Sequence, residues 1–180
     1  MLVDGGLDVI GTRRIGRDRS ELPLLAFQIP VARLLLVAAA VPLMLIAATQ
    51  LMKSHAPFAL VLLYALSLLA LPWRQLWLFQ ATERMAAAAL ADMLRMGVFA
   101  ALVWLLVRSP DDMRNVGWAE IAAVVTMTLY CLLVQHFAVA RIRLRGSFDG
   151  FGSLLREGAA VGSTNLVWAL NQYAPLFLIG

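Results

Sequence analysis

Long apolar segments separated by short polar turns dominate the pattern of this chain. A helix needs about 20 mainly apolar residues to cross the hydrocarbon core of a bilayer. Five segments meet this requirement and are predicted to be transmembrane helices: residues 30–52, 57–81, 85–107, 116–140 and 158–180. The turns between them are too short to hold a further domain. The pattern therefore predicts an all-α, polytopic transmembrane helix bundle of about five spans, forming a single domain over residues 1–180.

Three local features refine this pattern. Pro72 interrupts the second segment, and because proline removes a backbone donor, we expect a kink there. Residues 1–20 lack the apolar core and cleavage site of a signal peptide, so we expect them to form a loop. The small residues from Gly158 to Gly162 are typical of a surface where two helix backbones approach closely.

The composition is also that of a protein in lipid. The chain has 180 residues, of which 62% are hydrophobic and 14% charged, whereas a soluble domain is about half apolar and about a quarter charged. The formal net charge of +4 lies in clusters between the apolar segments and not along one polar face, which does not indicate nucleic-acid binding. The single cysteine, Cys131, excludes a disulfide framework and a cysteine-based metal site.

The basic residues predict how the chain is oriented. Loops rich in lysine and arginine stay preferentially on the cytoplasmic side of a membrane. Arginines are concentrated before the first predicted span and after the fourth, at Arg13, Arg14, Arg17, Arg19, Arg141, Arg143, Arg145 and Arg156. We therefore expect a multi-pass protein of the cytoplasmic membrane, with the N-terminal segment and the loop 141–157 in the cytoplasm.

Ionisable side chains inside the predicted spans are the first functional candidates, because a charge at bilayer depth costs several kcal/mol. Asp92 and Arg95 are three residues apart on one helix, so they can form a local ion pair or line a cavity together. Arg33 lies about one turn inside the first span and can reach the cytoplasmic interface along its own stem or face a cavity. Glu120 is close to a span end, which favours an interfacial position.

The fifth predicted span carries an unusual number of polar residues for a helix that faces lipid. They are Ser163, Thr164, Asn165, Asn171, Gln172 and Tyr173. This load indicates a helix that lines a polar interior, although hydrogen bonding between helices would also explain it. The tryptophans near span ends are expected to anchor the chain at the interfaces: Trp73, Trp77, Trp104 and Trp118. We find no catalytic triad, nucleotide-binding loop or zinc motif, so we predict a non-enzyme without cofactor or metal.

One segment carries a specific resemblance to a known family: Trp77-Leu78-Phe79-Gln80-Ala81-Thr82-Glu83-Arg84-Met85. It resembles the tryptophan-aromatic-Gln-Gly-x-Glu turn of bacterial polysaccharide flippases of the O-antigen and exopolysaccharide type, in the multidrug/oligosaccharidyl-lipid/polysaccharide exporter superfamily. Ala81 stands where that turn usually has glycine, which leaves its tightness open. Residues 11–16 resemble the basic loop after the family's second helix, and residues 155–158 the start of its seventh. The odd number of predicted spans, the start inside a basic loop and the end without a polar tail lead us to expect a piece of a longer protein; a complete five-span protein is the alternative.

The resemblance implies a transporter that moves an oligosaccharide linked to polyprenyl pyrophosphate between the membrane leaflets, by alternating access of two lobes. Its expected partners are this lipid-linked oligosaccharide, membrane lipids and polysaccharide assembly proteins. Because guanidinium groups pair well with phosphate, Arg33 and Arg95 are the expected headgroup contacts. Asn165, Gln172 and Tyr173 are the expected sugar contacts. Asp92 would position Arg95 or bind a coupling ion.

Three other classes remain open at this point. A drug exporter of the same superfamily would be expected to use an acidic or apolar cavity, so the arginines inside the spans weigh against it. A membrane polymerase or ligase usually has a long extracytoplasmic loop, and the longest one here is residues 108–115. A structural or assembly subunit is the third alternative, and the polar fifth span weighs against it.

Overall fold

The chain folds into helices joined by short connections. The computed structural model describes residues 5–51, 58–109, 112–138 and 146–179, and this part of the chain contains no strand. Its elements are α1 (Leu7–Arg17), the 3₁₀ turn η1 (Arg19–Glu21), α2 (Leu22–Leu51), α3 (Phe58–Leu68), the 3₁₀ turn η2 (Leu71–Trp73), α4 (Leu76–Ala81), α5 (Met85–Leu106), α6 (Met113–Ala138) and α7 (Phe151–Ile179). The predicted all-α class is confirmed.

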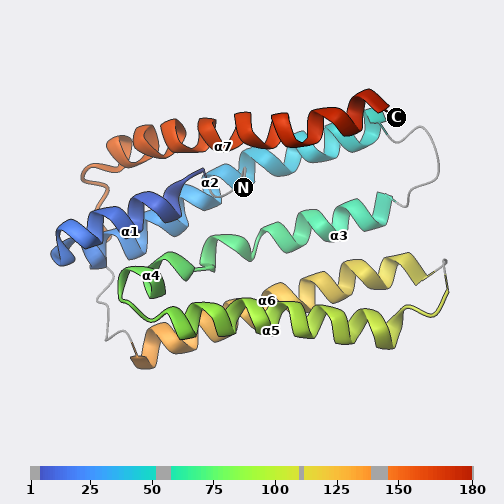
Figure 1. Ribbon diagram of the computed structural model, residues 1–180, viewed down its shortest axis with the longest axis horizontal. Helices are drawn as coiled ribbons and strands as arrows, with labels where there is room; N and C mark the ends of the chain where they lie inside the picture. The colour runs from blue at the N-terminus through green and yellow to red at the C-terminus, as the bar shows by residue number, and fades with distance from the viewer. Residues whose placement is uncertain (1–4, 52–57, 110–111, 139–145, 180) are drawn as a thin grey trace.

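The long helices lie side by side, with α7 and α2 along one edge of the bundle, α5 and α6 along the other, and α3 between them (Figure 1). Within the described part of the chain, four stretches are long and apolar enough to cross a membrane: Arg19–Ile46, Ala59–Ala81, Met85–Leu106 and Met113–Phe137. The chain is thus a helical transmembrane bundle. The fifth predicted span coincides with most of α7, and its crossing of the membrane stays a prediction, as do the bounds of the other spans.

Most of the described arginines outside the spans gather at one end of the bundle. The C-terminal end of α1, the α4–α5 turn and the start of α7 all lie at the left end in Figure 1, and they carry Arg14, Arg17, Arg84 and Arg156. The connection between α5 and α6, which carries Arg108, lies at the opposite end. This arrangement agrees with the predicted sidedness, although residues 139–145 with three further arginines lie outside the described residues.

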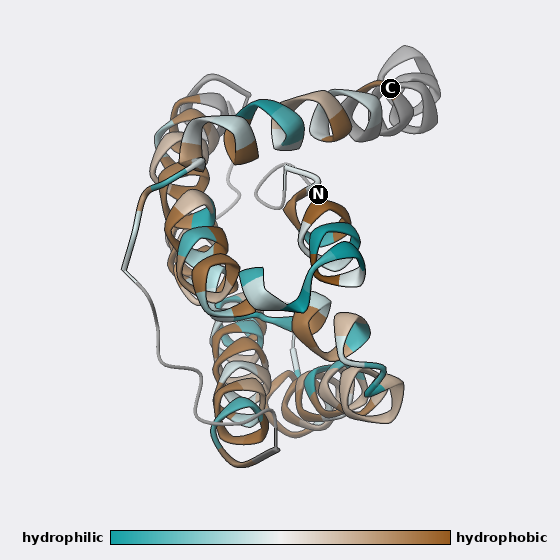
Figure 2. Cartoon of the chain, turned by 90° about the vertical axis from the view of Figure 1, so that its left-hand side faces the viewer, coloured by the Kyte–Doolittle hydropathy of each residue, from teal (hydrophilic) through white to brown (hydrophobic). Residues whose placement is uncertain are grey.

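Helix α1 corrects the expectation that residues 1–20 form a loop. Leu7, Ile10, Gly11 and Ile15 are buried on one side of it, at the spacing of an amphipathic helix. The apolar residues among them pack into a core with Trp77. Figure 2 shows that α1 carries both hydrophobic and hydrophilic residues. A helix of 11 residues is too short and too polar to register as a span, which is why the hydropathy pattern did not reveal it.

Trp77 is likewise a core residue and not an interfacial anchor. It is fully buried, whereas Trp73, Trp104 and Trp118 are about half exposed or more, as anchors should be. The indole ring fits against α1 because position 11 is glycine: a Cβ atom there would lie 2.8 Å from the Trp77 ring and 2.7 Å from Ile29 Cδ1. One small residue thus lets α1, α2 and α4 meet.

The predicted kink at Pro72 is a complete interruption of the helix. Helix α3 ends at Leu68, η2 holds Pro72 at its second residue, and α4 begins only at Leu76. Because proline cannot donate a backbone hydrogen bond, the chain changes direction here before it enters the segment that carries Trp77.

The α4–α5 turn is tight although Ala81 replaces the usual glycine. The Arg84 N–H donates to the carbonyl of Phe79 at 2.7 Å, and the Glu83 N–H donates to that of Gln80 at 3.1 Å. This pair of bonds is the Schellman motif, which requires a left-handed residue just after the helix. That residue is Glu83, with φ of 60°, and Ala81 remains inside α4.

Replacing Glu83 by glycine is therefore expected to stabilise the protein by about 1 kcal/mol, because a side chain at positive φ costs about this much. Glu83 is exposed, so little contact is lost. The measurement is the free energy of unfolding in mixed micelles of dodecyl sulfate. Thr82→Gly is the matched control and should destabilise, since Thr82 has φ of −98° and its hydroxyl donates to the Leu78 carbonyl. A lower stability of Glu83→Gly would contradict this explanation of the turn.

Candidate functional site

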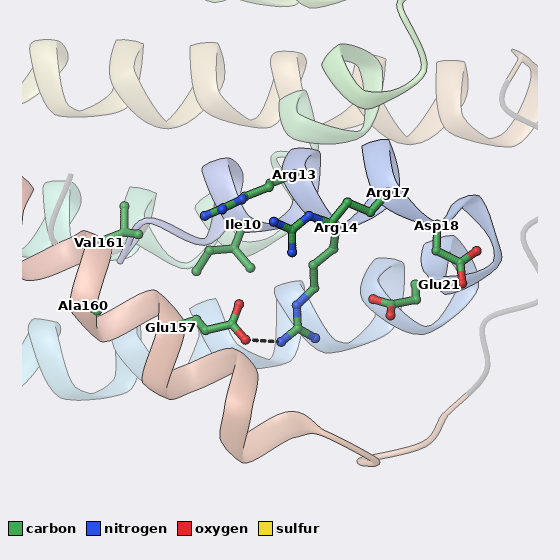
Figure 3. Close-up of a pocket in the computed structure, with 9 residues that line it drawn as sticks. All are labelled: Ile10, Arg13, Arg14, Arg17, Asp18, Glu21, Glu157, Ala160 and Val161. Carbon is green, nitrogen blue, oxygen red and sulfur yellow. Dashed lines mark hydrogen bonds and ion pairs between the residues drawn. The ribbon is translucent and has the colours of Figure 1, made fainter.

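A cleft of about 500 Å³ opens between α1 and α7 near the arginine-rich end of the bundle. Figure 3 shows its charged side chains, which extend from α1, η1 and the first half of α7. Its lining consists of Ile10, Arg13, Arg14, Arg17, Asp18, Glu21, Glu157, Ala160 and Val161. Six of its nine lining residues are charged, and it is the candidate functional site.

The wall on α1 follows directly from helix geometry. Ile10, Arg13, Arg14 and Arg17 stand at positions i, i+3, i+4 and i+7, so they occupy one face of the helix. Asp18 ends α1 and accepts a hydrogen bond from the Ser20 N–H at 2.8 Å. That bond holds the pKa of the Asp18 carboxyl below its usual value, so the group is ionised at neutral pH.

The opposite wall comes close because α7 has glycines where it meets the start of α1. A Cβ atom at Gly162 would lie 3.1 Å from the backbone of Gly5, and one at Gly158 would lie 3.1 Å from Leu7 and 3.2 Å from the Gly5 carbonyl. Gly6, at φ of +73°, faces Val161 in the same way. The small-residue packing predicted for residues 158–162 is therefore confirmed, and it sets the width of the cleft.

The three arginines of the cleft differ in how they are bound. Arg14 donates to Glu157 Oε1 at 2.7 Å and to Ser153 Oγ at 3.2 Å, which ties α1 to α7 across the cleft. Arg13 and Arg17 are exposed and have no hydrogen bond or ion pair among the described residues. Their guanidinium groups can therefore bind an anion that enters the cleft.

Arg33 is buried inside the bundle and does not extend along its stem into solvent. It is 3% exposed, forms an ion pair with Asp8 on α1, and donates to the backbone carbonyl of Arg74. The contacts connect α2, α1 and the segment between η2 and α4. Arg33 does not line the cleft, so the structure places it as a cross-link between three elements.

Arg95 forms its ion pair with Glu120 on α6, and not with Asp92 on its own helix. The local Asp92–Arg95 pair that the spacing allows is therefore not formed, and Asp92 is exposed on α5. Glu120 is buried between the helices, and its predicted interfacial position stays a prediction. The physical reason is that the long arginine side chain reaches a buried carboxylate on the neighbouring helix, where pairing reduces the cost of burying both charges.

The polar residues of α7 are described only in part. The hydroxyls of Ser163 and Thr164 donate back to the Ala160 carbonyl, at 2.8 Å and 3.4 Å. Their hydrogen-bond donors are therefore used within α7. The side chains of Asn165, Gln172 and Tyr173 lie outside the described residues, and their predicted role as sugar contacts is untested.

Sequence reasoning took Arg13, Arg14 and Arg17 as orientation signals and did not select them as site residues. A signal was available, because Ile10 and these arginines form one helical face that overlaps the motif at residues 11–16. The expectation of a loop at residues 1–20 concealed it.

A family model described as "Polysaccharide biosynthesis protein" matches residues 1–180, the whole of this chain. The chain belongs to the polysaccharide biosynthesis protein family. No curated protein and no solved structure matched it. Membership of this family, together with the transmembrane bundle, supports a role in the synthesis or export of polysaccharide at a membrane.

Proposed function

We propose that this polysaccharide biosynthesis protein moves an oligosaccharide linked to polyprenyl pyrophosphate from the cytoplasmic to the periplasmic leaflet of the bacterial cytoplasmic membrane. The observation that carries the proposal is the cleft between α1 and α7, with three arginines on one helical face. The basic end of the bundle, where the cleft lies, is the cytoplasmic end under the positive-inside rule.

The chemistry of the cleft suits both parts of such a headgroup. Arg13 and Arg17 would bind the pyrophosphate, because guanidinium groups donate two parallel hydrogen bonds to phosphate oxygens. Asp18, Glu21 and Glu157 would accept hydrogen bonds from sugar hydroxyls. A volume of about 500 Å³ is in the usual range for a ligand site, and the polyprenyl tail can stay in the bilayer.

The roles of the other candidate residues follow from where they lie. We propose that Arg33 and Arg95 position helices and do not contact the headgroup, because each is held by a carboxylate. Asn165, Gln172 and Tyr173 remain proposed sugar contacts, since α7 continues beyond the cleft wall. Asp92 remains a proposed coupling-ion site, because Arg95 does not neutralise it.

The test is the double variant Arg13→Ala/Arg17→Ala in the chromosomal gene. We expect surface polysaccharide to fall about tenfold or more at equal protein level, since two charge-assisted contacts are each worth over about 1 kcal/mol. Lipid-linked oligosaccharide should accumulate in the cytoplasmic leaflet. Arg13→Lys/Arg17→Lys should restore part of the loss.

The matched control is Arg108→Ala/Arg114→Ala, which removes the same charge from exposed positions in the connection between α5 and α6 and the first turn of α6. It should leave surface polysaccharide unchanged. Normal polysaccharide in the α1 double variant would overturn the proposed site. Single repeat units at the cell surface, instead of none, would point to polymerisation and not translocation.

A further inference from the structure

A second hollow lies on another side of the bundle and has a different character. It is a groove of about 240 Å³ between α2 and α6, closed at its floor by η2 and the residues after it. Its apolar lining comprises Ala26, Phe27, Pro30, Val31, Leu34, Trp73 and Leu132, and its polar lining is Gln75 and Gln135. It shares no lining residue with the arginine cleft.

The groove is lined by elements that belong to candidate membrane spans. The two helices that flank it, and the stretch that holds Trp73 and Gln75, are three of the four described stretches that can cross a membrane. Its edges are open, because Leu34 and Leu132 are well exposed, and so are Leu133 and Phe137 farther along α6. In a membrane, the molecule available to fill an apolar groove at this place is a lipid.

The two glutamines that line this groove each have a buried side-chain oxygen without a hydrogen-bond partner among the described residues. Gln75 is 3% exposed, and its Oε1 atom accepts no hydrogen bond from the described residues; the buried Oε1 of Gln135 is in the same state. An unsatisfied acceptor in an apolar place is unfavourable. A ligand that fits the groove should therefore carry N–H or O–H donors next to a hydrocarbon chain.

The position of these oxygens suits a lipid headgroup. Gln135 is three residues before the end of α6, and Gln75 immediately precedes α4, which is only six residues long. Both therefore lie toward the end of the bundle where α4 turns into α5 (Figure 1). Arg74 stands in the chain between the lining residues Trp73 and Gln75 but does not itself line the groove.

We propose that this groove binds one phosphatidylethanolamine molecule, with an acyl chain between α2 and α6 and the ammonium group donating to the oxygens of Gln75 and Gln135. An ammonium group supplies three donors in charge-assisted hydrogen bonds. Phosphatidylcholine fills the groove equally well with its chains but has no N–H to donate. The headgroup contact should therefore give the two lipids different affinities, whereas the acyl-chain contact should be the same for both. The inference is independent of the transport proposal, because it concerns a lipid retained by the resting protein.

Native mass spectrometry of the purified protein with phosphatidylethanolamine, phosphatidylcholine or phosphatidylglycerol of identical chains tests the proposal. We expect phosphatidylethanolamine to be retained about five- to tenfold more than phosphatidylcholine, as one or two additional hydrogen bonds predict. Gln75→Leu/Gln135→Leu should bring this ratio close to one. Gln80→Leu, at an exposed glutamine of α4, should leave it unchanged.

A second pair of variants tests the groove without touching the glutamines. Leu132→Trp fills the groove and should reduce the retention of both lipids, whereas Leu133→Trp, which does not line the groove, should not. This pair decides the question if the double glutamine variant does not fold. Equal retention of the first two lipids by the unmodified protein, preference for phosphatidylglycerol, or equal retention by Leu132→Trp and Leu133→Trp would each overturn the proposal.

Discussion

Replacing Asp8 by alanine is expected to lower the free energy of unfolding by about 3–5 kcal/mol, the usual cost of breaking a buried ion pair from one side. Arg33 is 3% exposed and bound to Asp8, so the variant leaves a buried cation without this carboxylate. The measurement is the unfolding midpoint in mixed micelles, together with the amount of protein in the membrane fraction.

The double variant Asp8→Ala/Arg33→Met provides the control for this prediction. It removes both charges and should recover part of the stability, because the desolvated charge is gone. Glu157→Ala breaks the more exposed pair with Arg14 and should cost no more than about 1 kcal/mol. Equal losses for Asp8→Ala and Glu157→Ala would show that the Arg33 pair is no more important than a surface contact.

Gly11→Ala should destabilise the bundle by about 1–3 kcal/mol, although alanine is the better helix former. The new Cβ atom would lie 2.7–2.8 Å from Ile29 Cδ1 and the Trp77 ring. The ring is fully buried in the core and cannot move without displacing its neighbours. The same unfolding titration measures the effect.

Gly16 on the same helix offers a matched comparison, because nothing lies within 4 Å of the position that its Cβ would take. Gly16→Ala should therefore be neutral or stabilise by up to about 1 kcal/mol, through helix propensity alone. The two variants make the same chemical change in one helix and should have opposite signs. Destabilisation by both, to the same extent, would mean that α1 resists any substitution and that the Trp77 contact is not the cause.

Several parts of this protein could be predicted from its sequence because they depend on short stretches of chain. An apolar run of about 20 residues satisfies its own backbone hydrogen bonds as a helix, so the all-α membrane bundle follows from hydropathy. Pro72 removes a backbone donor from its segment, so a disturbance of the helix there could be predicted. The small residues at 158–162 indicated close helix packing. The segment around Trp77 indicated the family.

Tertiary structure alone decided the partners of the charged residues. Sequence spacing placed Asp92 next to Arg95, but the bundle brings Glu120 to that arginine; it also brings Asp8 to Arg33. The helix at residues 7–17, too short and polar to be a span, forms because its apolar side meets Trp77 and Leu154. Only then do its arginines face α7 and form the cleft. Hydropathy is a property of each segment, whereas ion pairs and clefts depend on which segments become neighbours, and that is determined by packing among all the helices.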